Sequence, residues 1–404
     1  MNLEDVNYKA KSKWLLLISG VVLCDVLSSY IFKSQFDVSF PVNSVLPLLV
    51  IFIFILIDAR YLKVPFFYLI VWIAGVIGFI IGIFAIEEMS AWHFLRIGSA
   101  SCAYFIGFTL FNYVYDKNKV GILYLIISIF YVVIGVTALS GLFPNNLPVI
   151  NSYWSNYGII QARPEVFTDQ NFQIFYLIPS VLAYLCLNSV FLVFMSFVLL
   201  IGAFYFLVKL QTRSGVLVFV ALIYLSIVSS FYHKKISKKR ILFMMLLIFI
   251  FFLIEQERLF SLFEIILARF DDPFAKNAFQ GRLFSSIYGI QNILNFEYWV
   301  PQGSQEFKFL YQDVPHSNFT AMFLNAGILG AVLWLGLFLY PLIRLFVYMI
   351  NRDVDVVAIS VFLGAFSVMM AQLTLNVPLN TQVWFWAGAT LGVICRMKAL
   401  NYKD

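Results

Sequence analysis

The chain is a succession of long apolar runs separated by shorter polar stretches. A run of roughly 17–25 apolar residues is long enough for a helix to cross a bilayer. Such runs predict helices over residues 14–32, 43–58, 65–87, 94–115, 120–142, 171–188, 190–209, 215–232, 240–255, 328–350, 356–374 and 380–396. The nearly continuous block 171–209 is divided at Asn188. The pattern therefore predicts an all-α, polytopic integral membrane protein of about twelve transmembrane helices, with residues 1–404 forming a single transmembrane domain.

The composition also favours lipid as the solvent. Hydrophobic residues make up 62% of the chain, charged residues make up 12%, and the mean hydropathy is +0.90. A water-soluble chain of this length cannot bury so much apolar surface. The first apolar run follows MNLEDVNYKAKSK without a small-residue cleavage site, so we expect a retained signal anchor. The four cysteines lie far apart inside apolar runs, which is typical of small buried hydrophobic side chains: Cys24, Cys102, Cys186 and Cys395.

The positions of lysine and arginine predict the orientation. With the N-terminus in the cytoplasm, more than half of the 27 lysines and arginines fall on the cytoplasmic side, including Arg344, Arg396 and the run HKKISKKR at 233–240. Both termini are then cytoplasmic. The net charge of +6 reflects this orientation, and we expect the lipid bilayer, and no nucleic acid, as a partner.

Two of the connections on the opposite, outer face are long, namely 143–170 and 256–316. Function in a membrane protein often lies where the chain departs from minimal connections. The larger loop precedes the tenth long span and contains an amphipathic stretch around 282–296. Its apolar side chains Leu283, Ile287, Ile290 and Leu294 fall on one side. This stretch either lies in the membrane interface or packs as an ordinary helix on the bundle.

His316 lies where the chain re-enters the membrane after the larger loop. The sequence HSNFTAMFLNAGILGAVLW predicts a short helix, a break at Gly327-x-x-Gly330 and then a full span, because glycine lets the backbone reorient. Histidine suits proton transfer near neutral pH. The alternative is a histidine that only caps the helix.

Three arginines lie on the same outer face. Arg213 in LQTRSG begins a span, Arg282 in FQGRLF lies in the larger loop, and Arg163 in QARPEVFTDQN lies in the other loop. The planar guanidinium fork matches phosphate oxygens and stays charged when buried. Convergence of these arginines with His316 would form a diphosphate clamp with a proton acceptor. In the alternative reading, each arginine pairs with one of the acids of the same face.

The predicted outer face carries no motif for a metal or a nucleotide. It has no paired carboxylates at DxD spacing, because the pair Asp353 and Asp355 falls in a predicted cytoplasmic connection, and the sequence contains no G-x-x-x-x-G-K and no nucleotide-binding glycine loop. We therefore expect no metal site and no cofactor, and metal-free chemistry on a lipid diphosphate is favoured over use of a sugar nucleotide.

These segments, in this order, resemble the bacterial O-antigen ligase family. The string from His316 through NFTAMFLNA to Gly327-x-x-Gly330 is similar to its histidine motif, and LQTRSGVLVFVALIYL and GRLFSSIYGIQNIL are similar to its two arginine segments. The resemblance covers residues 160–396; the five earlier spans agree only in hydropathy. The wider superfamily also contains O-antigen polymerases, which extend the repeat unit.

The resemblance implies a membrane glycosyltransferase of O-antigen or other polysaccharide biosynthesis in the bacterial inner membrane. The donor would be a glycan on undecaprenyl diphosphate at the periplasmic face, with 256–316 carrying part of the active site. Arg213 and Arg282 would hold the diphosphate, with Arg163 less closely matched, and His316 would act on the acceptor hydroxyl. Attack at the anomeric carbon would invert its configuration. Lipid A-core as the acceptor, in a ligase, is slightly favoured over a lipid-linked glycan, in a polymerase.

A transporter or flippase is the rival class. Such proteins place charged residues at the middle of the bilayer, inside broken helices. Here the interiors of the spans are nearly free of charge, with Asp25 and Arg96 as the exceptions, and polar groups collect at the outer rim. This distribution favours transfer chemistry. A membrane scaffold without chemistry also stays open.

Overall fold

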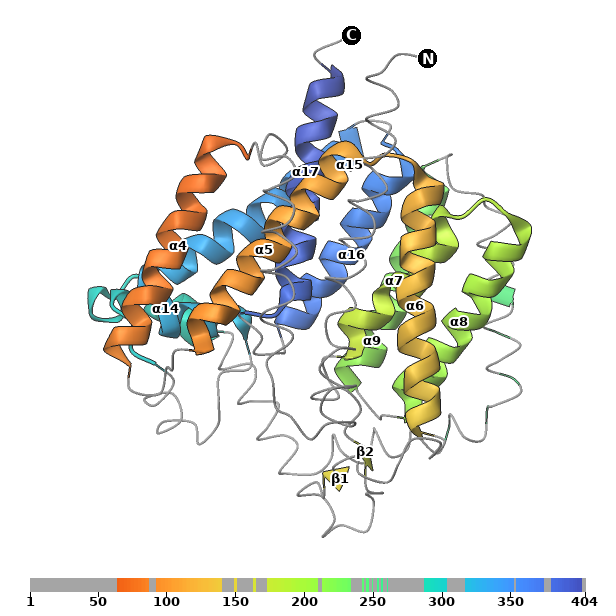
Figure 1. The fold of residues 1–404 in the computed structure, drawn as a ribbon, viewed down its shortest axis with the longest axis horizontal. Coiled ribbons are helices and arrows are strands. Elements are labelled where there is room, and N and C mark those ends of the chain that lie inside the picture. Colours follow the sequence, from red (N-terminus) through yellow and green to blue (C-terminus); the bar gives the residue numbers. More distant parts are fainter. Residues whose placement is uncertain are drawn as a thin grey trace. The chain divides into compact units, whose positions relative to one another are not determined.

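The computed structural model describes most of the apolar helices in two compact units. The described residues are 64–86, 92–139, 149–150, 163–164, 173–209, 213–233, 287–303, 317–351, 354–373 and 379–401, with isolated residues between 242 and 260. The predicted spans 14–32 and 43–58 and most of 240–255 lie outside them. Each unit is considered by itself below (Figure 1).

One unit contains the N-terminal helices that are described and the C-terminal part of the chain. Its elements are α4 (Phe66–Ala85), α5 (Trp92–Tyr113), the 3-10 helix η4 (Phe296–Trp299), α14 (Asn318–Trp334), the π-helix η5 (Leu335–Leu339), α15 (Tyr340–Asn351), α16 (Val356–Gln372) and α17 (Thr381–Asn401). The elements α14, η5 and α15 follow one another along the chain without a gap, but α14 itself is interrupted at Gly327.

The other unit contains the helices α6 (Lys117–Leu139), α7 (Gln173–Cys186), α8 (Val190–Lys209) and α9 (Arg213–Tyr232). The predicted division at Asn188 is confirmed, because α7 ends and α8 begins on either side of it. Two short strands, β1 (Val149–Ile150) and β2 (Arg163–Pro164), pair antiparallel.

Three described helices are long and apolar enough to cross a membrane. They are Phe66–Ala85, Phe94–Tyr113 and Asn318–Asn351. The predicted all-α class is confirmed for the described part, apart from the two short strands, and these helices are compatible with a membrane protein. The number of spans, the large outer loop and the orientation stay predictions.

Close glycine contacts join α5 to α17. A Cβ atom on Gly388 would overlap the carbonyl oxygen of Tyr104, and one on Gly392 would overlap that of Phe108. From the other side, a Cβ on Gly107 would overlap the carbonyl oxygen of Phe385. Small residues let helix backbones approach closely and gain van der Waals contact, which is how helices associate when lipid offers no hydrophobic drive.

A buried arginine joins α17 to the ends of two other helices. Arg396 of α17 donates to Asp355 Oδ2 at 2.7 Å and to the carbonyl oxygens of Val114 and Phe111 at 3.2 and 3.4 Å. Asp355 also caps α16 by accepting from the backbone N–H of Ala358 at 2.7 Å. Helix C-termini leave carbonyls unpaired, and an arginine fork is suited to bind several at once. The sequence indicated only a surface topology charge for Arg396, which is in fact 5% exposed.

The helix α4 lies beside α14 (Figure 1) and packs against both α14 and η5. A Cβ on Gly78 would lie 2.8 Å from the carbonyl oxygen of Ala326, and one on Gly75 would overlap the side chain of Leu333. On η5, a Cβ on Gly336 would lie 2.8 Å from Val71 Cγ1. The helix α4 therefore lies directly beside the segment in which the sequence predicts a break.

Candidate functional site at the broken helix

The helix α14 is interrupted at Gly327. This residue has φ 61° and ψ −150°, within a stretch that is otherwise helical from Asn318 to Trp334. Only glycine adopts this region of backbone conformation without large strain. A Cβ atom there would also overlap the carbonyl oxygen of Trp299. The predicted break at Gly327 is confirmed.

The second motif glycine allows the two halves of α14 to approach each other. A Cβ on Gly330 would overlap the carbonyl oxygen of Met322. In a straight helix these two residues would be separated by a rise of about 12 Å. Their contact therefore means that the chain folds back sharply at the break, and that Gly330 is required where the two halves cross.

The segment that precedes α14 in the chain satisfies the broken helix end. The carbonyl oxygen of Leu324 accepts hydrogen bonds from the backbone N–H groups of Gln302 and Gly303, both at 3.0 Å. Gly303 has φ 75°, which favours glycine. A break inside an apolar environment is tolerated only when neighbouring groups bind the freed backbone atoms. Gln302 and Gly303 provide that binding here.

A buried polar cluster lies at the start of α14. Gln372 Oε1, at the end of α16, accepts from Asn318 Nδ2 at 2.6 Å and from Trp334 Nε1 at 3.1 Å. Asn318 is fully buried and Gln372 is 2% exposed. Asn318 Oδ1 is buried and accepts no hydrogen bond from the part of the chain that the structure describes. The cluster fixes the first turn of the short helix against α16. Asn318 Oδ1 is the one atom of the cluster without a described hydrogen-bond donor.

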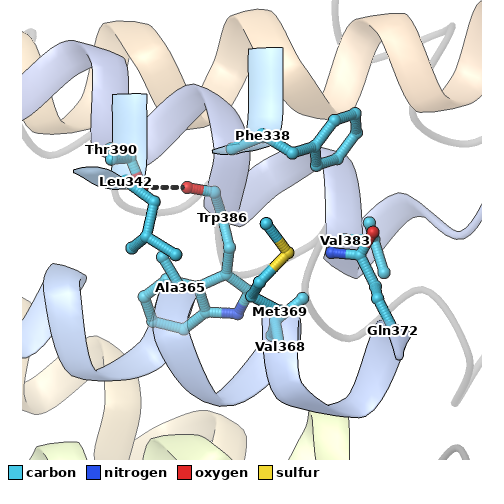
Figure 2. Close-up of a pocket in the computed structure, with 10 residues that line it drawn as sticks. Phe338, Leu342, Ala365, Val368, Met369, Gln372, Val383, Trp386 and Thr390 are labelled. Carbon is cyan, nitrogen blue, oxygen red and sulfur yellow. Dashed lines mark hydrogen bonds between the residues drawn. The ribbon is translucent and has the colours of Figure 1, made fainter. Parts of the chain in front are cut away.

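A small cavity lies beside Gln372 (Figure 2). Figure 2 shows the amide nitrogen of Gln372 on the side of Met369. The hydroxyl of Thr390 is occupied, because it donates to the carbonyl oxygen of Trp386 at 2.8 Å. The cavity volume of about 10 Å³ is close to the minimum for a single water molecule. It therefore has no room for a sugar or a diphosphate.

The structure tests only part of the predicted site. Arg213 is the first residue of α9, and Arg163 is the first residue of β2; the side chains of both lie outside the description. Arg282 and His316 lie outside the described residues. Whether the arginines and His316 converge thus stays a prediction.

Sequence reasoning missed the partners that hold the short helix. Gln372 is a polar residue at the end of an apolar span, and such residues in a membrane are expected to bind another polar group. Its spacing from the candidate motif gave no sign that it meets Asn318 and Trp334. The described residues also include no group of three His, Cys, Asp or Glu side chains that could hold a metal ion.

Comparison of the chain with protein-family models, curated proteins and solved structures finds no match. The resemblance to O-antigen ligases therefore depends on the motif residues and their order.

Proposed function

We propose that the chain is a polytopic inner-membrane glycosyltransferase of about twelve spans. It transfers a glycan from an undecaprenyl diphosphate-linked donor to an acceptor hydroxyl at the periplasmic face, without a metal ion. Ligation to lipid A-core is slightly favoured, and polymerisation of repeat units onto a lipid-linked glycan uses the same donor chemistry.

The observation that carries this proposal is the short helix that directly follows His316 and ends at the break in α14. Its first residue is Asn318, its N-cap Ser317 is extended, and it ends at Gly327. The N-terminus of a helix presents N–H groups and a partial positive charge, which favour a bound anion. The resemblance to O-antigen ligases assigns the proton acceptor to this same point of the chain, beside a helix end suited to a diphosphate.

The proposed reaction is a single displacement. The acceptor oxygen forms a bond to the anomeric carbon, and His316 takes the hydroxyl proton. The bond from the anomeric carbon to the diphosphate oxygen breaks, and its electron pair leaves with undecaprenyl diphosphate. Arg213 and Arg282, with Arg163 as a further candidate, stabilise the negative charge that grows on the leaving group, which lowers the barrier selectively.

A transporter or flippase is the second candidate function, and the same broken helix favours it. Secondary transporters bind substrates at helices that are interrupted within the membrane. In that case the half-helix beginning at Asn318 would bind the diphosphate head of a lipid-linked glycan, and no covalent bond would form. The two functions therefore differ in chemistry rather than in the ligand.

The first test is His316→Ala in the cognate strain without its native copy, at matched membrane expression. Gel analysis of lipopolysaccharide and of undecaprenyl-linked glycans reads the result. For a ligase, core-linked O-chains vanish while long lipid-linked polymer accumulates. For a polymerase, cores with a single repeat remain and the ladder is lost. His93→Ala, a histidine in the first turn of α5, is the matched control and should leave both patterns unchanged.

A reconstituted assay separates transfer from transport. Purified protein in vesicles receives a lipid-linked glycan and an acceptor on the same side of the membrane. A transferase forms the glycosidic bond there, and His316→Ala abolishes it. Movement of the donor across the membrane, with no new bond in either protein, would overturn the transferase and support the flippase.

A further inference from the structure

Residues 290–300 present an exposed apolar surface next to the broken helix. Five large side chains form this surface, which we term the 290–300 surface: Ile290, Leu294, Phe296, Trp299 and Val300. Leu294 is 84% exposed and Phe296 is 72% exposed. Glu297 is the only charged residue between 287 and 303. An exposed apolar cluster of this kind marks contact with a partner or a membrane.

Internal contacts hold the segment in one shape. Trp299 Nε1 donates to the carbonyl oxygen of Ile293 at 2.9 Å, and the rings of Phe296 and Trp299 lie 4.4 Å apart. The side chain of Asn295 accepts from the backbone N–H of Glu297, at the start of η4. The apolar side chains are therefore presented together by an ordered segment.

The opposite side of the segment is fixed to α14. Tyr288 packs with Leu324 of the short helix and with Tyr298. A Cβ on Gly289 would lie 2.8 Å from Thr320 Oγ1. Together with the backbone bonds to Leu324 from residues 302 and 303, these contacts leave the 290–300 surface as the face of the segment that still needs a partner.

The position of the segment along α4 identifies that partner. The helix α4 has 20 residues and therefore spans about 30 Å, the thickness of the hydrocarbon layer. A Cβ on Gly303 would lie 2.9 Å from Ile86 Cγ2, at the C-terminal end of α4. The segment thus lies where a span ends. The helix α4 also exposes a stripe of apolar side chains that continues to this end, with Ile77, Ile81 and Phe84.

We propose that the 290–300 surface inserts into the bilayer at the boundary between hydrocarbon and headgroups, in contact with lipid acyl chains. Tryptophan and other aromatic residues are favoured at this depth, and an apolar face at the surface of a membrane binds through the area that it buries. The inserted segment also binds the freed backbone of α14, so lipid contact holds the break in place. This inference requires α4 to span the bilayer; it does not depend on glycan transfer.

Depth measurements on the full-length protein in phospholipid vesicles test the proposal. Leu294→Cys and Glu297→Cys each receive a nitroxide label, and the unsubstituted protein, labelled in parallel, corrects for native cysteines. Power-saturation EPR compares collisions with oxygen, which concentrates in hydrocarbon, and with a water-soluble nickel complex. We expect the oxygen-to-nickel ratio at position 294 to exceed that at 297 several-fold.

Two outcomes would overturn the proposal. Equal and high nickel access at both positions would mean that the surface faces water. Shielding of position 294 from both reagents would mean that protein covers it, either another segment or a second copy. A second measurement uses the native residue: brominated phospholipids should quench a component of tryptophan fluorescence that is absent in Trp299→Phe. No difference in quenching between the two proteins would contradict insertion.

Discussion

Two buried amides determine how the short helix begins. Gln372 Oε1 is the shared acceptor of Asn318 Nδ2 and Trp334 Nε1, although Asn318 and Gln372 are 54 residues apart in the chain. A buried donor that loses its partner lowers the stability of the folded protein, because it has given up its hydrogen bonds to water without gaining another. The start of α14 therefore depends on one side chain that the motif itself does not include.

Replacing Gln372 with leucine tests this dependence. Gln372→Leu removes the acceptor from both donors, and we expect a loss of stability of about 1–3 kcal/mol for each unpaired group. The measurement is the melting temperature in one detergent at one scan rate. Thr390→Val is the matched control beside the same cavity, because among the described residues that hydroxyl binds its own helix, at the carbonyl of Trp386. Equal melting of Gln372→Leu and Thr390→Val would refute the importance of the cluster.

Arg396 is required for the several donors of its guanidinium group as well as for its charge. Its fork binds Asp355 and the carbonyls that end α5, so Arg396→Lys keeps the charge but loses most of the contacts. We expect both Arg396→Lys and Arg396→Met to lower stability, by about 1–3 kcal/mol. The carboxylate is 39% exposed, which moderates the loss.

Thermal unfolding of the purified variants measures the effect. Lys398→Met, an exposed cation on the same helix, is the control and should melt with the unsubstituted protein. If Arg396→Lys were as stable as the unsubstituted protein, a point charge would be sufficient and the fork geometry would have no role.

At the scale of elements, the sequence identified the helices better than their contacts. The expected spans 65–87 and 356–374 correspond to α4 and α16 within a few residues, since long apolar runs bounded by polar residues leave little choice. The break at Gly327 was also predictable, because glycine pairs permit it. The capping of the Leu324 carbonyl by Gln302 and Gly303 was not predictable, because backbone N–H donors do not depend on the type of side chain.

Substitution of the break residue tests its geometry. Gly327→Ala places a side chain in a backbone region that other residues avoid, at a cost of order 1–3 kcal/mol, and it adds an overlap with the carbonyl of Trp299. We expect lower melting temperature and, if the proposed function holds, loss of glycan transfer. Asn325→Ala, two residues earlier in the same helix, is the control. Normal melting and transfer in Gly327→Ala would show that the break is dispensable.

At the scale of the whole molecule, the apolar pattern and the arrangement of basic residues predict topology, but the three described helices long enough to cross a membrane do not fix its orientation. Nor does the pattern say whether distant arginines meet. Hydropathy determines which segments enter lipid, whereas convergence of Arg213, Arg282 and His316 depends on packing between helices far apart in the chain.

Fusions to alkaline phosphatase check the predicted orientation. The enzyme needs disulfides and is active only outside the reducing cytoplasm. A fusion after position 310, in the predicted outer loop, should be active, and one after position 238, in the basic run, should be inactive. The reverse pattern would invert the topology and place the histidine motif on the cytoplasmic side.

The capping of α14 also has a consequence for biosynthesis. The chain is made from its N-terminus, so Gln302 and Gly303 leave the ribosome before Leu324, whose carbonyl they bind. The donors that end the short helix are present when that helix forms. The interruption therefore requires no later remodelling of a finished span. We expect a deletion within 301–303 to impair membrane insertion before it impairs any later step.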